Sequence, residues 1–371
     1  MEIRKIKSSI KQIDKIYHVS DIHIRTLKRH KEYKTVFKNL FEYINTSATE
    51  NSVAVVTGDI VHSKLDMSPE LIQMLIEFFK GFTIPTIVIL GNHDMNLNNL
   101  YRLDAISPIL DGFVDSNIIF IKDNEVFEYG GITWNHMAVD IAPNEYIRGT
   151  DINAPYKIAL HHGAVDTATT DIGYTISNKH VTTENFEGHD LVLLGDIHKP
   201  AQFLNDKKTI GYPGSLIQQN HGEALEHGIL VWDVKKKSSE FVKIENDYGY
   251  VTLITKGNKI IEHPKQMPKK PRIRIKFDNT DASDMKRLIA TIKKRYNVQD
   301  ISIQRSINNS INNVNANSVI GNIRDVEYQN TLLTDYVSTN FPQATEAEID
   351  AIRHINRNTN SKLPVLESVR H

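Results

Sequence analysis

The chain has 371 residues, with 44 Lys and Arg against 45 Asp and Glu, and it contains no cysteine. This length exceeds that of one ordinary core and predicts two compact domains with an appendage, whereas the near-neutral charge by itself indicates no nucleic-acid partner. The lack of cysteine excludes disulfides, thiolate zinc sites and cysteine nucleophiles, so any metal must be held by His, Asp, Glu or Asn.

From residue 15 to about residue 244, short apolar runs alternate with longer segments whose apolar residues recur at helical spacing. This alternation is typical of strands joined by helical crossovers. The predicted strands are Lys15–Val19, Val53–Val56, Thr86–Leu90, Ile118–Ile121, Gly131–Trp134, Ile158–Leu160, Leu191–Leu194 and Gly228–Val234. Helices are predicted at Tyr33–Tyr43 and Pro69–Phe79. The pattern favours an α/β fold with a central pair of sheets flanked by helices, and ligands in loops beyond the strand carboxyl ends.

After Tyr248 the pattern changes to that of a small α+β domain. Its predicted elements are strands at VTLIT (251–255) and RIRIKF (272–277), a helix at Asp284–Tyr296 and a strand at Asp300–Gln304. Between Pro264 and Arg305 there are 12 Lys and Arg against 4 Asp and Glu, a local excess of eight positive charges. Either a negatively charged partner or a merely solvated basic face explains this excess.

The asparagine-rich segment 307–318 (INNSINNVNANS) predicts a linker. Two short amphipathic helices are predicted beyond it, around Leu332–Val337 and Ile349–Ile355, and Thr345 with Glu348 matches a capping box. Helices this short bury little apolar surface alone, so they either dock on another protein or pack back on their own domain. The predicted divisions of the chain are therefore residues 1–247, 248–305, a linker at 306–320 and a helical segment at 321–371.

Five short polar motifs each follow a predicted strand. They are DIH at 21–23, GDIVH at 58–62, GNHD at 91–94, HHG at 161–163 and GDIH at 195–198. Each alone is weak evidence, because such short patterns are common and a lone histidine is usually structural. Their order and placement indicate a binuclear metal site, since such a site needs hard or borderline ligands from several chain segments and neighbouring strand ends bring them together.

In these motifs the chain resembles the calcineurin-like metallophosphoesterases, and within them the SbcD-type nucleases of double-strand-break repair, which include phage proteins. The resemblance covers the motifs from Asp21 to His198. It implies a β-sandwich flanked by helices, a small capping domain that also binds DNA, and a helical C-terminal segment that binds a partner. The nuclease branch is indicated by weaker features: Ser68-Pro69 after GDIVH, the HHG and GDIHK elements, and the added small domain.

The resemblance also implies a set of metal ligands. One ion would take Asp21, His23, Asp59 and His198, and a second would take Asp59, Asn92, His161 and Asp196. Asp59 would bridge the two ions, and His161 is preferred to His162 because its position matches the family's histidine. Asp196 stands where the family usually has histidine, so the second position either becomes harder or loses this ligand.

Three further residues receive roles from the resemblance. His93 would contact the scissile phosphate and protonate the departing oxygen. Asp94 would orient His93. His62 would support DNA or the geometry of the active site, although a purely structural role fits it equally well.

The function implied is that of a manganese-dependent DNA exonuclease and endonuclease subunit, which hydrolyses phosphodiesters with two divalent ions, Mn²⁺ being the expected metal. The implied partners are DNA ends or single strands, an SbcC-like coiled-coil ATPase and a second copy of the chain. No apolar run approaches the roughly 20 residues of a membrane span, which predicts a protein of the cytoplasm, or of the host cytoplasm if phage-encoded. The alternatives are a phosphoprotein phosphatase, a nucleotide phosphodiesterase, or an inactive scaffold that regulates an ATPase.

Overall fold

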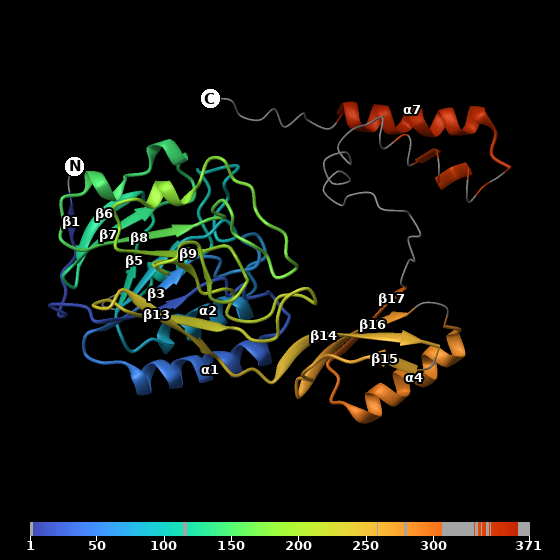
Figure 1. The fold of residues 1–371 in the computed structure, drawn as a ribbon, viewed down its shortest axis with the longest axis horizontal. Coiled ribbons are helices and arrows are strands. Elements are labelled where there is room, and N and C mark those ends of the chain that lie inside the picture. The colour runs from blue at the N-terminus through green and yellow to red at the C-terminus, as the bar shows by residue number, and fades with distance from the viewer. Residues whose placement is uncertain are drawn as a thin grey trace. The chain divides into compact units, whose positions relative to one another are not determined.

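A computed structural model of the chain describes two units, Met1–Ser306 and Ile307–His371 (Figure 1). The described residues are 3–113, 117–257, 259–277, 280–305, 330, 333, 334, 336–338, 341 and 343–362. The predicted linker at 306–320 lies outside them. Among the described residues, no helix is both long and apolar enough to cross a membrane.

Two sheets form the larger part of the first unit. The seven-stranded sheet has the order β1 (Arg4–Lys5), β6 (Glu125–Tyr129), β7 (Ile132–Met137), β8 (Lys157–His162), β9 (Leu191–Gly195), β11 (Ile210–Tyr212) and β10 (Gln202–Phe203). The six-stranded sheet has the order β13 (Ser238–Lys243), β12 (Gly228–Asp233), β2 (Lys15–Val19), β3 (Ser52–Thr57), β4 (Thr86–Ile89) and β5 (Ile118–Phe120). Strands β2 to β5 are parallel to one another, as are β7 to β9.

The two sheets pack face to face around a shared apolar core. Side chains from both sheets meet there, including Ile16 and Val53 from one sheet and Trp134 and Leu160 from the other. Strand β3 is buried throughout because both of its faces are covered, which is why it reads as a continuous apolar run. In both sheets, the carboxyl ends of the parallel strands lead directly into polar loops.

Helices α1 (His30–Ser47) and α2 (Pro69–Gly81) cover the outer face of the six-stranded sheet. Figure 1 shows α1 in blue along one side of the sandwich, with β6 to β9 in green on the other. Helix α2 begins where the sequence predicts, because the Ser68 hydroxyl accepts a hydrogen bond from the Leu71 N–H and Pro69 occupies the first helical position. Its buried face supplies Phe78 and Phe79 to the core.

The outer face of the seven-stranded sheet is covered by loops and short helical turns. These turns are Pro143–Glu145, Gly149–Asp151 and Thr183–Phe186. Phe186, Val192 and Tyr212 belong to the small apolar cluster on this face. The short helix α3 (Ser107–Leu110) lies instead beside α2, in the core of the other sheet.

A four-stranded sheet with one helix forms a small α+β domain. Its strand order is β15 (Lys259–Glu262), β14 (Tyr248–Lys256), β16 (Lys270–Phe277) and β17 (Asp300–Arg305). Helix α4 (Ala282–Arg295) packs on one face through Met285, Leu288 and Ile292, which contact Ile273 and Ile275 of the sheet. This domain thus has an apolar cluster of its own.

The second unit contains α7 (Glu346–Lys362). Its start confirms the predicted capping box, since the Thr345 N–H donates to Glu348 Oε2 (2.7 Å) and the Glu348 N–H donates to Thr345 Oγ1 (3.4 Å). Arg353 of α7 donates to Thr334 Oγ1 (2.9 Å), so the described parts of this unit contact each other. Leu332 of the other predicted helix lies outside the described residues.

The predicted α/β fold class is confirmed, and each predicted strand and helix before residue 306 corresponds to an observed one. The sequence did not predict β1, β6, β10, β11, β13 or β15, most of which are short or lie at sheet edges. One boundary error matters for the site. Strand β8 continues to His162, two residues beyond the predicted end.

Candidate metal centre

The polar motifs converge at the carboxyl ends of the parallel strands. The residues placed there are Asp21 and His23 after β2, Asp59 after β3, Asn92 and His93 after β4, His162 at the end of β8, and Asp196 and His198 after β9. Backbone hydrogen bonds connect neighbouring loops. For example, the His23 N–H in the loop after β2 donates to the Asp59 carbonyl in the loop after β3 at 2.9 Å. Parallel strands place their carboxyl ends at one edge of a sheet, so residues far apart in sequence meet here.

A first group of donor atoms surrounds the imidazole of His23. Its Nε2 lies 3.0 Å from His198 Nε2, 3.5 Å from Asp59 Oδ2 and 3.8 Å from Asp21 Oδ1. Neighbouring ligands of an ion bound at roughly 2.1 Å lie about 3 Å or a little more apart. The four residues therefore fit one divalent cation, as the sequence predicts for the first ion.

A second group surrounds the imidazole of His162. Its Nε2 lies 3.0 Å from Asn92 Oδ1, 3.3 Å from Asp59 Oδ1 and 3.9 Å from Asp196 Oδ1. Asp59 thus directs Oδ2 toward the first group and Oδ1 toward the second. This is the arrangement that a carboxylate bridging two cations requires, and Asp196 lies close enough to serve the second.

The structure directs His162 toward the centre and His161 away from it, contrary to the predicted choice of His161 as a ligand. Side chains alternate along a strand, and Ile158 and Leu160 of β8 point into the core between the sheets. His162 has the same parity and points toward the centre, whereas His161 points to the other face, where Nδ1 lies 2.9 Å from the Met137 carbonyl and the ring contacts Phe186. Burial lowers the pKa of His161 to about 4, so this side chain is a neutral core residue.

Substitutions in this pair should separate the two roles. We expect His162→Ala to weaken cation binding at the second group by more than roughly 100-fold, because losing a ligand costs more than losing a residue that only supports one. His161→Phe should keep the metal content and lose about 1 kcal/mol of stability with its hydrogen bond. Metal analysis and thermal unfolding of both variants test this expectation. If His161→Phe loses its metal, His161 is the ligand after all and the assignment of His162 fails.

Four of the candidate ligands hold strained backbone conformations. Asp21, His23, Asp59 and Asp196 have φ of 52°, 49°, 52° and 97°. Such left-handed conformations cost on the order of 1 kcal/mol or more for a residue with a side chain, and they cluster at functional sites. Two of these side chains reach neighbouring loops, since Asp21 accepts the Asp196 N–H and Asp59 accepts the His93 N–H.

The buried carboxylates of the centre also favour the binding of cations. Asp21 and Asp59 are 0% and 2% exposed, and buried carboxylates are costly unless a positive charge compensates them. Burial raises the pKa of Asp21 to about 6. Burial alone would lower the pKa of His198, but the carboxylates of Glu223 and Asp21 raise it to about 9. A bound cation would replace the proton on that imidazole, and the mixture of carboxylate, amide and imidazole donors suits Mn²⁺ or a similar ion.

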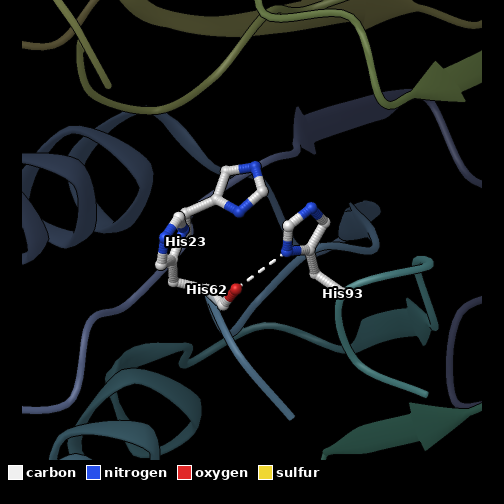
Figure 2. A group of neighbouring side chains, drawn as sticks. All are labelled: His23, His62 and His93. Atoms are coloured by element: carbon white, nitrogen blue, oxygen red, sulfur yellow. Dashed lines mark hydrogen bonds between the residues drawn. The ribbon is translucent and has the colours of Figure 1, made fainter. Parts of the chain in front are cut away.

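Three imidazoles gather at one side of the centre, those of His23, His62 and His93 (Figure 2). The dashed line in Figure 2 is the bond between His93 Nδ1 and the His62 carbonyl, at 2.8 Å. With Nδ1 donating to that carbonyl, Nε2 of His93 is available to a substrate. The ring centroids of His93 and His23 are 4.9 Å apart, so His93 lies beside the first group.

Asp94 does not orient His93, contrary to the prediction. Its Oδ1 accepts the backbone N–H groups of Ile60 and Val61, both at 2.9 Å, and its Oδ2 accepts that of Gly91 at 2.9 Å. Asp94 therefore fastens the loop after β3 to the loop after β4. His93 is instead oriented by the backbone of His62, whose own Nε2 lies 3.1 Å from Arg25 Nη1.

Sequence reasoning missed Glu223. Its Oε1 accepts a hydrogen bond from His198 Nδ1 at 2.9 Å, which directs His198 Nε2 toward the first group. Carboxylates that fix a metal-binding histidine in this way strengthen its affinity for metal. Glu223 lies 25 residues beyond His198 in a loop without any motif, so no local signal marks it.

The profile of the family described as calcineurin-like phosphoesterase matches residues 14–200. The chain is 41% identical to an uncharacterized protein of Acanthamoeba polyphaga mimivirus over 81% of its own length, and the match spans only 23% of that protein. It is 22% identical to a putative phosphoesterase of Invertebrate iridescent virus 6, covering 58% of this chain and 75% of that one. It is 25% identical to a probable cyclic nucleotide phosphodiesterase of Xenorhabdus bovienii, covering 50% and 77%. The matched residues span all five polar motifs, and the chain belongs to the calcineurin-like phosphoesterase family.

Proposed function

We propose that this chain is a manganese-dependent DNA nuclease that hydrolyses phosphodiester bonds with two divalent cations. The observation that carries the hydrolytic part is Asp59, whose two carboxylate oxygens face two separate groups of donor atoms. Two cations held there would supply Lewis acidity toward water and toward the phosphate oxygens. No nucleophile from the protein is then required.

The chain's own residues have separable tasks in this proposal. The candidate ligands set the position of the phosphate, and His93 donates a proton from Nε2 to the departing oxygen. The His62 carbonyl holds that ring in place by its bond to Nδ1. A pocket of about 300 Å³ opens beside Asp196 and His198 and leaves room for the group next to the scissile phosphate.

The support for DNA comes from a basic strip on β16. Lys270, Arg272, Arg274 and Lys276 alternate with Pro271, Ile273 and Ile275, and the two isoleucines face α4. The four cations therefore share the sheet face that α4 does not cover. Arg274 lies between Thr252 and Ser302 on the neighbouring strands, and Lys276 lies between Ile254 and Gln304, so neither faces a charged residue there. Arg272 is instead paired with the buried Glu32. Two cations at alternate positions without a facing carboxylate suit the regularly spaced phosphates of a nucleic acid.

Within this strip, Arg274 and Lys276 are the best candidates for phosphate contacts, because neither forms an ion pair with any described residue. We expect Arg274→Ala with Lys276→Ala to weaken duplex binding and to lower the slope of log affinity against log salt by about 2. Lys293→Ala with Lys294→Ala on the exposed side of α4 removes the same charge from the opposite face. Equal losses in the two double variants would mean that only net charge matters and that the strip is not a specific track.

The partners implied by the resemblance remain part of this proposal. They are a second copy of the chain and an SbcC-like coiled-coil ATPase, with the segment around α7 as the docking element. The relatives in two viruses support a viral origin.

A cyclic nucleotide phosphodiesterase is the second candidate, because the Xenorhabdus relative carries that name. To decide, the purified chain is stripped with a chelator and supplied with Mn²⁺ or Mg²⁺, then given linear duplex DNA, single-stranded DNA, a cyclic nucleotide and a chromogenic phosphomonoester. We expect Mn²⁺-dependent cleavage of DNA. Hydrolysis of the cyclic nucleotide or the monoester without any cleavage of DNA would contradict the nuclease function, while the assignment as a phosphoesterase would stand.

A further inference from the structure

The small α+β domain meets the phosphoesterase domain at a loop that also supports the metal centre. The side-chain amide of Gln218 pairs twice with the backbone of Tyr250 on β14, donating to its carbonyl at 3.1 Å and accepting its N–H at 2.6 Å. Glu223, which holds His198, lies in the same loop. The small domain and a candidate metal ligand are thus attached to one short segment.

A buried ionic group reinforces this junction. Glu32 is fully buried, accepts two hydrogen bonds from Arg29, both at 2.9 Å, and forms an ion pair with Arg272 of β16 at 2.7 Å. Burial alone would raise the pKa of Glu32, but Arg29 and Arg272 hold it below its usual value. A group of this kind depends on every partner, since removal of one leaves a buried charge uncompensated.

A single peptide group also links Arg29 to Glu223, the residue that orients His198. Its Nη2 donates to the Gln218 carbonyl at 2.6 Å, and the N–H of that same peptide, which belongs to Gln219, donates to Glu223 Oε2 at 2.5 Å. Glu223 Oε1 then accepts from His198 Nδ1. Hydrogen bonds linked in this way polarise one another, so the cation at Arg29 strengthens the bond to Glu223.

The backbone at Arg29 is unusual for its position. Arg29 is the residue before helix α1, with φ of 66° and no side-chain hydrogen bond that caps the helix. Asparagine or glycine would adopt this conformation at lower cost. The strain indicates that the side chain is needed where it lies.

We propose that Arg29 is a positioning residue that connects the small domain to the candidate metal ligand His198, through the Gln218–Gln219 peptide and Glu223. The inference rests on the proposed function only in taking His198 as a ligand. Arg29 holds Glu223 in the orientation that fixes the His198 ring, and it does so while bound to Glu32, which also binds Arg272. The affinity of the first group for a cation therefore depends on the contacts between the small domain and the phosphoesterase domain.

The test is a double-mutant cycle in Mn²⁺ affinity, measured by calorimetry on the metal-free full chain without nucleic acid. We expect Arg29→Lys to weaken one of two Mn²⁺ sites by about 10-fold, because lysine keeps the charge but cannot serve Glu32 and Gln218 together. Glu223→Gln should weaken the same site. The double variant should lose no more than the worse single variant, since both changes break one connection. Additive losses, or unchanged affinity in Arg29→Lys, overturn the proposal.

One control and one alternative variant complete the experiment. Lys269→Ala removes an exposed ion pair with Asp247, 2.9 Å long, at the same junction and should leave Mn²⁺ affinity within about twofold. Arg29→Gln is the second variant if Arg29→Lys unfolds, and it should weaken the same site. A wild-type chain that binds Mn²⁺ but does not cut DNA would reject the nuclease alone, because the cycle is measured without DNA.

Discussion

Asp59→Asn is expected to abolish phosphodiester hydrolysis and to lose most of the bound metal at both groups. The amide that replaces the carboxylate carries no charge and offers one oxygen, whereas Asp59 directs Oδ2 toward His23 at 3.5 Å and Oδ1 toward His162 at 3.3 Å. Losing a shared ligand should weaken each cation by more than roughly 100-fold, which exceeds the usual effect of a supporting residue. Metal content after dialysis and hydrolysis of a chromogenic phosphodiester measure both effects.

A matched control is Asp206→Asn, which makes the same chemical change at an exposed position. It should leave metal content and activity unchanged. If Asp59→Asn keeps one cation at full occupancy, the carboxylate serves only one group and the bridging role is wrong. Asp59 Oδ1 also accepts the His93 N–H at 2.8 Å, so thermal unfolding must be recorded to separate loss of metal from loss of fold.

His93→Ala is expected to reduce kcat by about 10² to 10⁴, the range typical of a lost general acid, while metal content stays near that of the wild type. The reason is geometric, because His93 Nδ1 is engaged by the His62 carbonyl and only Nε2 remains for the substrate. The measurement is kcat on a diester with a poor leaving group beside one with p-nitrophenolate. A leaving group that needs no proton should reduce the effect of the substitution.

The exposed His180 provides the control for this variant, and His180→Ala should change neither rate nor metal content. The nitrogens of His93, His23 and His62 lie close enough together to hold an ion. Loss of metal in His93→Ala as complete as in Asp59→Asn would therefore make His93 a ligand and reject its role as an acid.

The amino-acid sequence by itself determined the fold class and the meeting of the polar motifs at one edge of the sheets, because both depend on local patterns. Apolar runs such as Val53–Val56 predict buried strands, and polar residues directly after parallel strands must meet at one edge of a sheet. For this reason the motifs are enough to place Asp21, Asp59 and Asn92 at the same edge of the sheet. The capping box of Thr345 and Glu348 is local as well, and its prediction is confirmed.

The tertiary structure decided what depends on side-chain direction and on contacts between distant segments. His162 replaces His161 because β8 runs two residues further than its apolar pattern, and the parity of a strand fixes which side chain enters the centre. Asp94 accepts two backbone N–H groups of the loop after β3 and one of its own loop, and it forms no such bond with its neighbour His93. Glu223 and Arg29 lie outside every motif, and only the packing of distant segments brings Glu223 to His198 and Arg29 to the Gln218 carbonyl. Such contacts produce no local pattern in the sequence, because the packing of the whole chain determines which distant segments form hydrogen bonds with each other.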